Sequence, residues 1–126
     1  MIICYYSSFL FILNSIIAFY YNYYIYSLLF LFLTITSLLF HYNAYYYLID
    51  QLAVYLLIFY GGYLFYTKFK LNICSVIILY SFIYTIFLFY GGYWLQEFCY
   101  CKKYGNMWHS LVHIITIIGH LFIILL

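Results

Sequence analysis

Residues 107–126 read MWHSLVHIITIIGHLFIILL, and this stretch contains no Asp, Glu, Lys or Arg. A helix needs about 20 apolar residues to cross the hydrocarbon core of a bilayer, so the stretch predicts a membrane-spanning helix. It begins with two histidines four residues apart, His109 and His113, which share one face of such a helix. Because ionisable side chains inside a membrane are costly and tend to serve a function, these histidines indicate where the chemistry of the chain lies.

The rest of the chain has the same apolar character. Of its 126 residues, 71% are hydrophobic and 5% are charged, whereas a soluble domain has about 45–50% apolar and about 25% charged residues. The net charge is only +2, and nothing in it indicates nucleic-acid binding. We therefore predict an all-α, polytopic transmembrane helix bundle: one integral, multi-pass membrane domain over residues 1–126.

Polar and charged clusters divide the chain into five hydrophobic segments. Their expected bounds are roughly 2–21, 25–42, 45–66, 73–95 and 107–126. Backbone N–H and C=O groups inside the hydrocarbon must be bonded internally, so each segment is expected to be helical. The first segment lacks the basic region and the cleavage site of a signal peptide, and is therefore expected to be a retained span.

The number of segments places the polar residues of three helices at one face of the membrane. The second segment ends on the side that holds the N-terminus, with Ser37 and His41 in its last turns. The third segment begins on that side with Asp50, and the fifth begins there with His109 and His113. At a rise of about 1.5 Å per residue, all five residues lie within about two turns of the same face. The sequence therefore predicts one shared site.

The residue types of this site suit a metal ion. Three imidazoles that leave one open coordination position are the ligands of a catalytic zinc ion, which predicts His41, His109 and His113 as ligands. Asp50 is expected to hold a bound water or to orient a histidine. Ser37, one turn from His41, is expected to hydrogen-bond the same water or a developing oxyanion.

The histidines also permit other interpretations. A lone membrane histidine is more often a packing or hydrogen-bonding residue, and we expect this role for His120, which lies on the face of His113 but about 10 Å deeper. Axial ligation of a haem by His41 and His113 is a further alternative. It leaves His109 unexplained.

The same residues resemble the signature of a membrane hydrolase superfamily. Its members include the alkaline ceramidases, the progestin and adiponectin receptors and the hemolysin III-like proteins. Ser37-Leu-Leu-Phe-His41 is similar to its S-x-x-x-H motif, Leu48-Ile49-Asp50 to the segment with its aspartate, and His109-Ser-Leu-Val-His113 to its H-x-x-x-H motif. The order along the chain agrees. Family members have seven spans, and the loss of two spans preserves the side on which the motifs lie.

The resemblance implies a zinc ion bound by His41, His109 and His113 at the membrane interface. Ser37 and Asp50 would be the catalytic residues that assist the water on the metal. The implied activity is hydrolysis of an amide in a membrane lipid, for example a sphingolipid such as ceramide.

A non-enzymatic function is the alternative to this hydrolase. The chain would then be a small membrane subunit or a receptor-like remnant without metal, in a helix-mediated oligomer or a larger membrane complex. Its sequence Phe-Tyr-Gly-Gly-Tyr, which occurs at 59–63 and again at 89–93, predicts two close helix contacts, because glycine lets helices approach each other.

Overall fold

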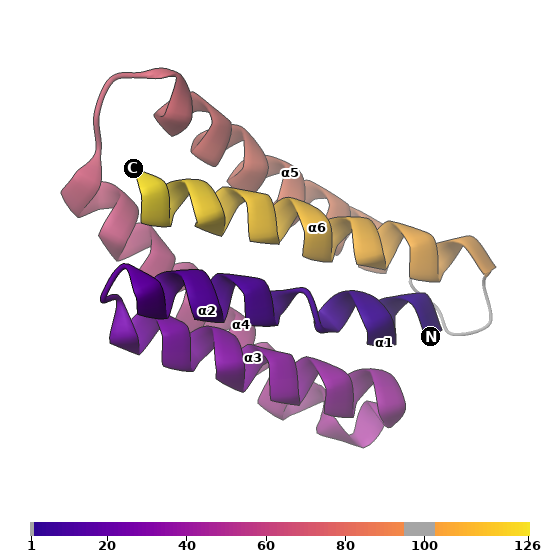
Figure 1. Ribbon diagram of the computed structural model, residues 1–126. Helices are drawn as coiled ribbons and strands as arrows, with labels where there is room; N and C mark the ends of the chain where they lie inside the picture. Colours follow the sequence, from indigo (N-terminus) through magenta and orange to yellow (C-terminus); the bar gives the residue numbers. More distant parts are fainter. Residues whose placement is uncertain (1, 95–102) are drawn as a thin grey trace.

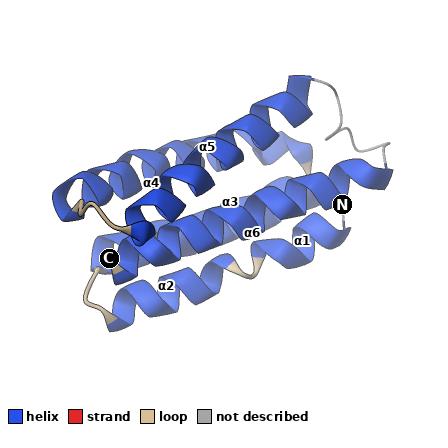
Figure 2. Cartoon of the chain, turned by 90° about the horizontal axis from the view of Figure 1, so that it is seen from above, coloured by secondary structure: helices blue, strands red, loops and turns tan. Residues whose placement is uncertain are grey.

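The computed structural model describes residues 2–94 and 103–126, and over these residues the chain is a bundle of helices joined by short connections (Figure 2). The helices are α1 (Ile2–Ser8), α2 (Phe11–Tyr20), α3 (Tyr24–Tyr42), the 3₁₀ helix η1 (Ala44–Tyr46), α4 (Tyr47–Lys68), α5 (Ile73–Trp94) and α6 (Lys103–Leu125). Since α1 and α2 follow each other as one rod, the predicted all-α bundle of about five helices is confirmed.

The surface of the bundle is that of a membrane protein. Three helical stretches are long and apolar enough to cross a bilayer, namely α3, α4 and the part of α5 over Ile73–Gly91. Shorter apolar stretches cover Tyr5–Tyr20 and His109–Leu125. Large apolar side chains point outward, among them Phe59, which is 74% exposed, and Phe87, which is 69% exposed. Large apolar patches of this kind are rare on soluble monomers, whereas lipid accommodates them.

The first rod lies between α3 and α6, as Figure 1 shows. On the other side of the bundle, α4 packs against α3 and α6, and α5 packs against α6. Although α4 and α5 are consecutive in the chain, they make little contact with each other. Tyr26, Phe30 and Leu57 are fully buried at the centre of the bundle.

The first rod is broken, although the sequence predicts one span over 2–21. Between α1 and α2 the backbone tightens to bonds between residues three apart, from Phe9 N to Tyr6 O and from Leu10 N to Ser7 O, both 3.1 Å. The break directly follows Ser7-Ser8, and serine pairs are among the known causes of helix kinks. Both serine side chains are used for bonds to other helices, as described below.

The far end of α6 is closed by a lysine. Nζ of Lys68 donates hydrogen bonds to the carbonyl oxygens of Ile123, at 2.8 Å, and Ile124, at 2.9 Å. The same ammonium group lies 4.8 Å from the centre of the Tyr23 ring. The last carbonyls of a helix have no partner in their own helix and carry partial negative charge, so Lys68 satisfies them and ties α4 to α6.

The first Phe-Tyr-Gly-Gly-Tyr sequence makes the predicted close helix contact, and it does so through one glycine. A Cβ atom at Gly61 would lie 2.7 Å from Cε1 of His120 and 3.2 Å from the Tyr26 hydroxyl. For Gly62 and Gly91 such an atom would meet nothing within 4 Å, so these two glycines make no close contact. Gly62 is rotated about 100° round the helix from Gly61 and so faces open space. The side of Gly92 lies outside the described residues.

Candidate metal centre

Three histidines from two helices converge at the end of the bundle that holds the N-terminus. His41 lies in the last turn of α3, and His109 and His113 lie on one face of α6. Their ring centres are 4.8 Å apart for His41 and His109, 4.9 Å for His109 and His113, and 5.3 Å for His41 and His113. One ring nitrogen from each histidine lies within 4.8 Å of the other two. The predicted convergence is therefore confirmed.

The cluster is shielded from the outside. His41 is 4% exposed and His113 is 6% exposed. Aromatic rings pack against the imidazoles, with Phe11 at 5.1 Å from His113 and Phe40 at 5.1 Å from His41 between ring centres. These walls keep bulk water away from the ring nitrogens.

One buried nitrogen of the cluster has no partner. Among the described residues, none accepts or donates a hydrogen bond at Nε2 of His41. Most buried polar atoms in native proteins are bonded, so such an atom needs an explanation. A metal ion held by the three imidazoles would explain it, because the ion would take the lone pair that the described residues leave unused.

His113 is held in place by a serine of the first rod. The hydroxyl of Ser7 shares a hydrogen bond of 2.7 Å with Nδ1 of His113. Histidine ligands of metals almost always use their second nitrogen in a hydrogen bond of this kind, which fixes the ring and leaves the other nitrogen for the metal. The bond from Ser7 therefore uses Nδ1 of His113 and keeps Nε2 available to a ligand.

Asp50 and Ser37 lie at the same end of the bundle, but neither bonds a histidine in the described part of the chain. Oδ1 of Asp50 accepts a hydrogen bond of 3.1 Å from the Thr36 hydroxyl, and the Ser37 hydroxyl shares one of 2.8 Å with Ser8. Both side chains are buried. The expectation that Asp50 orients a histidine is therefore not met, because Thr36 holds the carboxylate and Ser7 orients His113.

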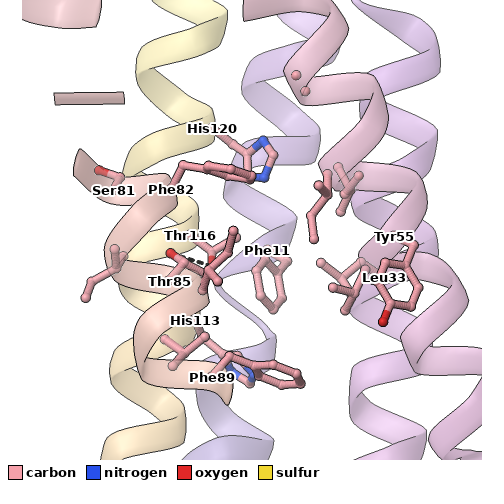
Figure 3. A pocket seen from close by; sticks show the side chains of 18 of the residues that line it. Phe11, Leu33, Tyr55, Ser81, Phe82, Thr85, Phe89, His113, Thr116 and His120 are labelled. Carbon is pink, nitrogen blue, oxygen red and sulfur yellow. Dashed lines mark hydrogen bonds between the residues drawn. The ribbon is translucent and has the colours of Figure 1, made fainter. Parts of the chain in front are cut away.

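A cavity of about 270 Å³ begins at this cluster and runs between α4, α5 and α6 (Figure 3). Asp50, Ser37, His109 and His113 line its first part, and His120 and Ile123 line its far part. The lining residues of α6 extend over about 20 Å at 1.5 Å per residue. The volume is close to the lower limit of ligand pockets, about 300 Å³. Most of the wall is apolar.

The serines of the first rod are the site residues that the sequence analysis misses. Ser7 and Ser8 bond His113 and Ser37, yet serine is common in membrane helices and carries no spacing signal here. The order of the spans could have indicated these two serines. The first span begins on the same side as the three other polar helix ends, and Ser7 and Ser8 lie within about two turns of that end.

The geometry also bears on the haem alternative. Two axial ligands need a porphyrin plane between them, but the His41 and His113 rings meet edge to face with centres 5.3 Å apart, and His109 lies beside both. The three histidines instead bring one ring nitrogen each within 4.8 Å of the others.

Comparison of the chain with models of known protein families, with curated proteins and with solved structures finds no match.

Proposed function

We propose that this chain is a multi-pass integral membrane protein that binds one zinc ion through His41, His109 and His113 and hydrolyses an amide bond in a membrane lipid. The observation that carries the proposal is the buried cluster itself. It brings three imidazole nitrogens within 4.8 Å of one another, and Nε2 of His41 is buried without a hydrogen-bond partner in the described part of the chain. The cluster lies at the mouth of a long apolar cavity.

The dimensions of the cluster suit zinc. Zinc–nitrogen bonds of about 2.0–2.1 Å in a tetrahedral site put the nitrogens roughly 3.3 Å apart. The three nitrogens lie within 4.8 Å of one another without an ion, so binding of zinc would draw them closer together. Because His109 and His113 line the cavity, a ligand in the cavity would meet a metal ion held by these residues.

The residues around the cluster provide the remaining chemistry. A zinc ion at this place supplies Lewis-acid activation of water and of the amide carbonyl. Thr36 holds one oxygen of Asp50, and this is the only hydrogen bond of that side chain among the described residues. The second oxygen is free to take a proton from the attacking water and to deliver it to the departing amine. The carbonyl carbon gains the hydroxyl group, and the products are a fatty acid and an amine.

Ser37 is placed to assist the carbonyl oxygen. Its hydroxyl lines the cavity and is backed by the Ser8 hydroxyl at 2.8 Å. If Ser8 donates to Ser37, the Ser37 proton is directed elsewhere and can be donated to the oxygen that becomes negative during attack. Stabilisation of this developing charge is often a large contribution to acyl-transfer catalysis.

The cavity indicates a lipid substrate. It is mostly apolar, its lining residues on α6 extend over about 20 Å, and the three-histidine cluster lies at one end, which suits an amide head with an acyl chain. It lies between α4 and α5, which make little contact, so a lipid can enter sideways from the bilayer. The resemblance to ceramidases favours a sphingolipid amide as the substrate.

Metal analysis of the purified protein tests the proposal. We expect about one zinc per chain in the wild type, and loss of both metal and amide hydrolysis in His113→Ala, because two imidazoles do not complete the site. The matched control is Ile114→Ala, which changes the next residue of α6, an exposed one, and should keep the zinc. Zinc retained at one per chain in His113→Ala would refute the ligand assignment. A wild type without zinc would favour the non-enzymatic membrane subunit.

A further inference from the structure

A second polar group lies deep in the cavity, apart from the three histidines. His120 is two turns beyond His113 on α6, which puts it about 10 Å farther from the cluster. Figure 3 shows the two rings at opposite ends of the view, with Phe11 between them. His120 lines the cavity and is only partly buried.

Three helices fix the position of the His120 ring. Its Nδ1 is hydrogen-bonded to the hydroxyl of Tyr26 on α3, a residue that is fully buried. Phe30 packs edge-on against the imidazole, with ring centres 5.2 Å apart. On α4, Gly61 leaves the space that the ring occupies, since a Cβ there would lie 2.7 Å from Cε1. The predicted helix–helix hydrogen bond of His120 is thus confirmed, and the ring is held in one place.

The second nitrogen of this ring is not used by the protein. Tyr26 is the only hydrogen-bond partner of the His120 side chain in the part of the chain that the structure describes. A neutral imidazole has one donor and one acceptor nitrogen, so Nε2 keeps one hydrogen-bonding function whichever tautomer is present. An ionisable residue at membrane depth with a spare polar atom is a candidate binding group.

The wall beside His120 is polar as well. Thr116 lies one turn before His120 on α6, and its hydroxyl donates to the Thr85 hydroxyl on α5 at a distance of 3.5 Å. Thr85, Thr116 and Ser81 all line the cavity. A purely hydrocarbon ligand would form no hydrogen bond with the nitrogen of His120 or with these hydroxyl groups, whereas a ligand hydroxyl could.

We infer that His120, held by Tyr26, is a second recognition site, and that it binds a hydroxyl group carried part-way along the acyl chain of the ligand. The inference rests on the proposed function for the chemistry of the ligand's head, because the amide must lie at the histidine cluster for the chain to reach His120. The preferred ligand is therefore an amide of a hydroxylated fatty acid.

Binding of three synthetic lipid amides tests this site. The probes have equal chain length and carry no hydroxyl, a mid-chain hydroxyl, or a hydroxyl on the carbon next to the amide. Each competes with a fluorescent lipid amide for the wild-type protein in lipid nanodiscs. We expect the mid-chain hydroxyl to improve affinity roughly three- to tenfold, the net value of one buried hydrogen bond. The hydroxyl next to the amide should give no such gain.

The variant His120→Leu should abolish the preference for the mid-chain hydroxyl while binding the plain probe within about twofold of the wild type. Ile115→Val, which alters another lining residue without a polar group, should keep the preference. Equal affinity of the wild type for the plain and the mid-chain probes would overturn the inference, and so would a preference that survives in His120→Leu. Because the wild-type comparison needs no variant, misfolding of His120→Leu leaves the test intact.

The same samples separate this inference from the proposed function. Binding is measured without turnover, and zinc is measured in parallel. A protein that prefers the mid-chain probe but holds no zinc would refute the hydrolase and retain the deep site. A zinc-containing hydrolase without the preference would refute the deep site alone.

Discussion

The two ends of the bundle use their polar groups in opposite ways. At the lysine end, where Lys68 meets the C-terminus of α6, the ammonium group bonds two carbonyl oxygens and lies against the Tyr23 ring. Nearby, Ser27 donates to the Ser15 carbonyl oxygen at 2.7 Å, and Ser15 donates to the Ser27 carbonyl oxygen at 2.9 Å. At the histidine end, by contrast, a buried nitrogen of His41 has no hydrogen-bond partner among residues 2–94 and 103–126.

This difference suggests that polar groups at one end of the helices stabilise the fold, and that those at the other end bind a ligand. A polar group that is fully bonded inside the protein ties helices together and has nothing left to offer a ligand. A buried group left unbonded destabilises the fold by about 1–3 kcal/mol and persists where a ligand satisfies it. The lysine end should therefore carry the stability of the empty protein, and the histidine end should gain stability only when it is loaded.

Replacement of Lys68 by methionine should have the largest effect on the fold. It removes two hydrogen bonds from a charged donor, each worth about 1.5–3 kcal/mol, and leaves two carbonyl oxygens unmet. We expect the free energy of unfolding to fall by about 3 kcal/mol in graded denaturation in mixed micelles, with zinc content unchanged. Lys70→Met is the matched control, since Lys70 is exposed. Similar losses in both variants would mean that charge alone, and not the closure of α6, matters.

Withdrawal of the metal should have the next largest effect, and it should act through the histidine end. Zinc that binds only the folded state stabilises it by about 2.7 kcal/mol when its free concentration is 100-fold above Kd. A chelator should therefore lower the melting temperature of the wild type and leave that of His113→Ala unchanged. The measurement is a thermal scan of both proteins with and without chelator. An equal shift in both would place the zinc elsewhere.

The sequence predicts those features that depend on one physical effect, the cost of placing charged groups in lipid. Charged and ionisable groups are so costly in lipid that the few in this chain indicate a functional site. The rise per residue of a helix then predicts that residues 41, 109 and 113 lie at similar depths in the membrane. Five helical rods and the convergence of His41 with His109 and His113 followed from this. That zinc occupies the cluster and that Asp50 and Ser37 act in catalysis stay predictions.

The parts that sequence reasoning missed depend on packing between helices. Neither Pro nor Gly marks the break at Phe9-Leu10, which follows two serines that bond other helices. The pattern Gly-Gly cannot show which glycine faces a neighbour, and of Gly61, Gly62 and Gly91 only Gly61 does. The weak contact between α4 and α5, which shapes the cavity, has no signature in either helix.

Replacement of Ser7 by alanine should weaken metal binding without removing a ligand. Ser7 orients His113 through Nδ1, and loss of such an orienting bond typically lowers metal affinity 10- to 100-fold. The affinity is measured by competition with a zinc-binding dye. Ser75→Ala, in α5 near the lysine end, is the control and should keep wild-type affinity, because its hydroxyl bonds the backbone oxygen of Lys70. Unchanged affinity in Ser7→Ala would mean that Ser7 only packs against the cluster.

The smallest expected effect on stability is that of substitutions at Gly61 and Gly62, in the middle of the bundle. They test whether the tight packing near the lysine end extends as far as His120. Gly61→Ala places a methyl group 2.7 Å from His120, so the ring must move and its bond to Tyr26 is strained. We expect a loss of about 1–2 kcal/mol. Gly62→Ala, one residue away, meets nothing within 4 Å and should gain up to about 1 kcal/mol from the better helix propensity of alanine. Unfolding in mixed micelles measures the change in the free energy of unfolding for both variants, and the test compares these two changes. If Gly61→Ala is as stable as Gly62→Ala, the His120 ring has room to move, and the tight packing does not extend from the lysine end as far as His120.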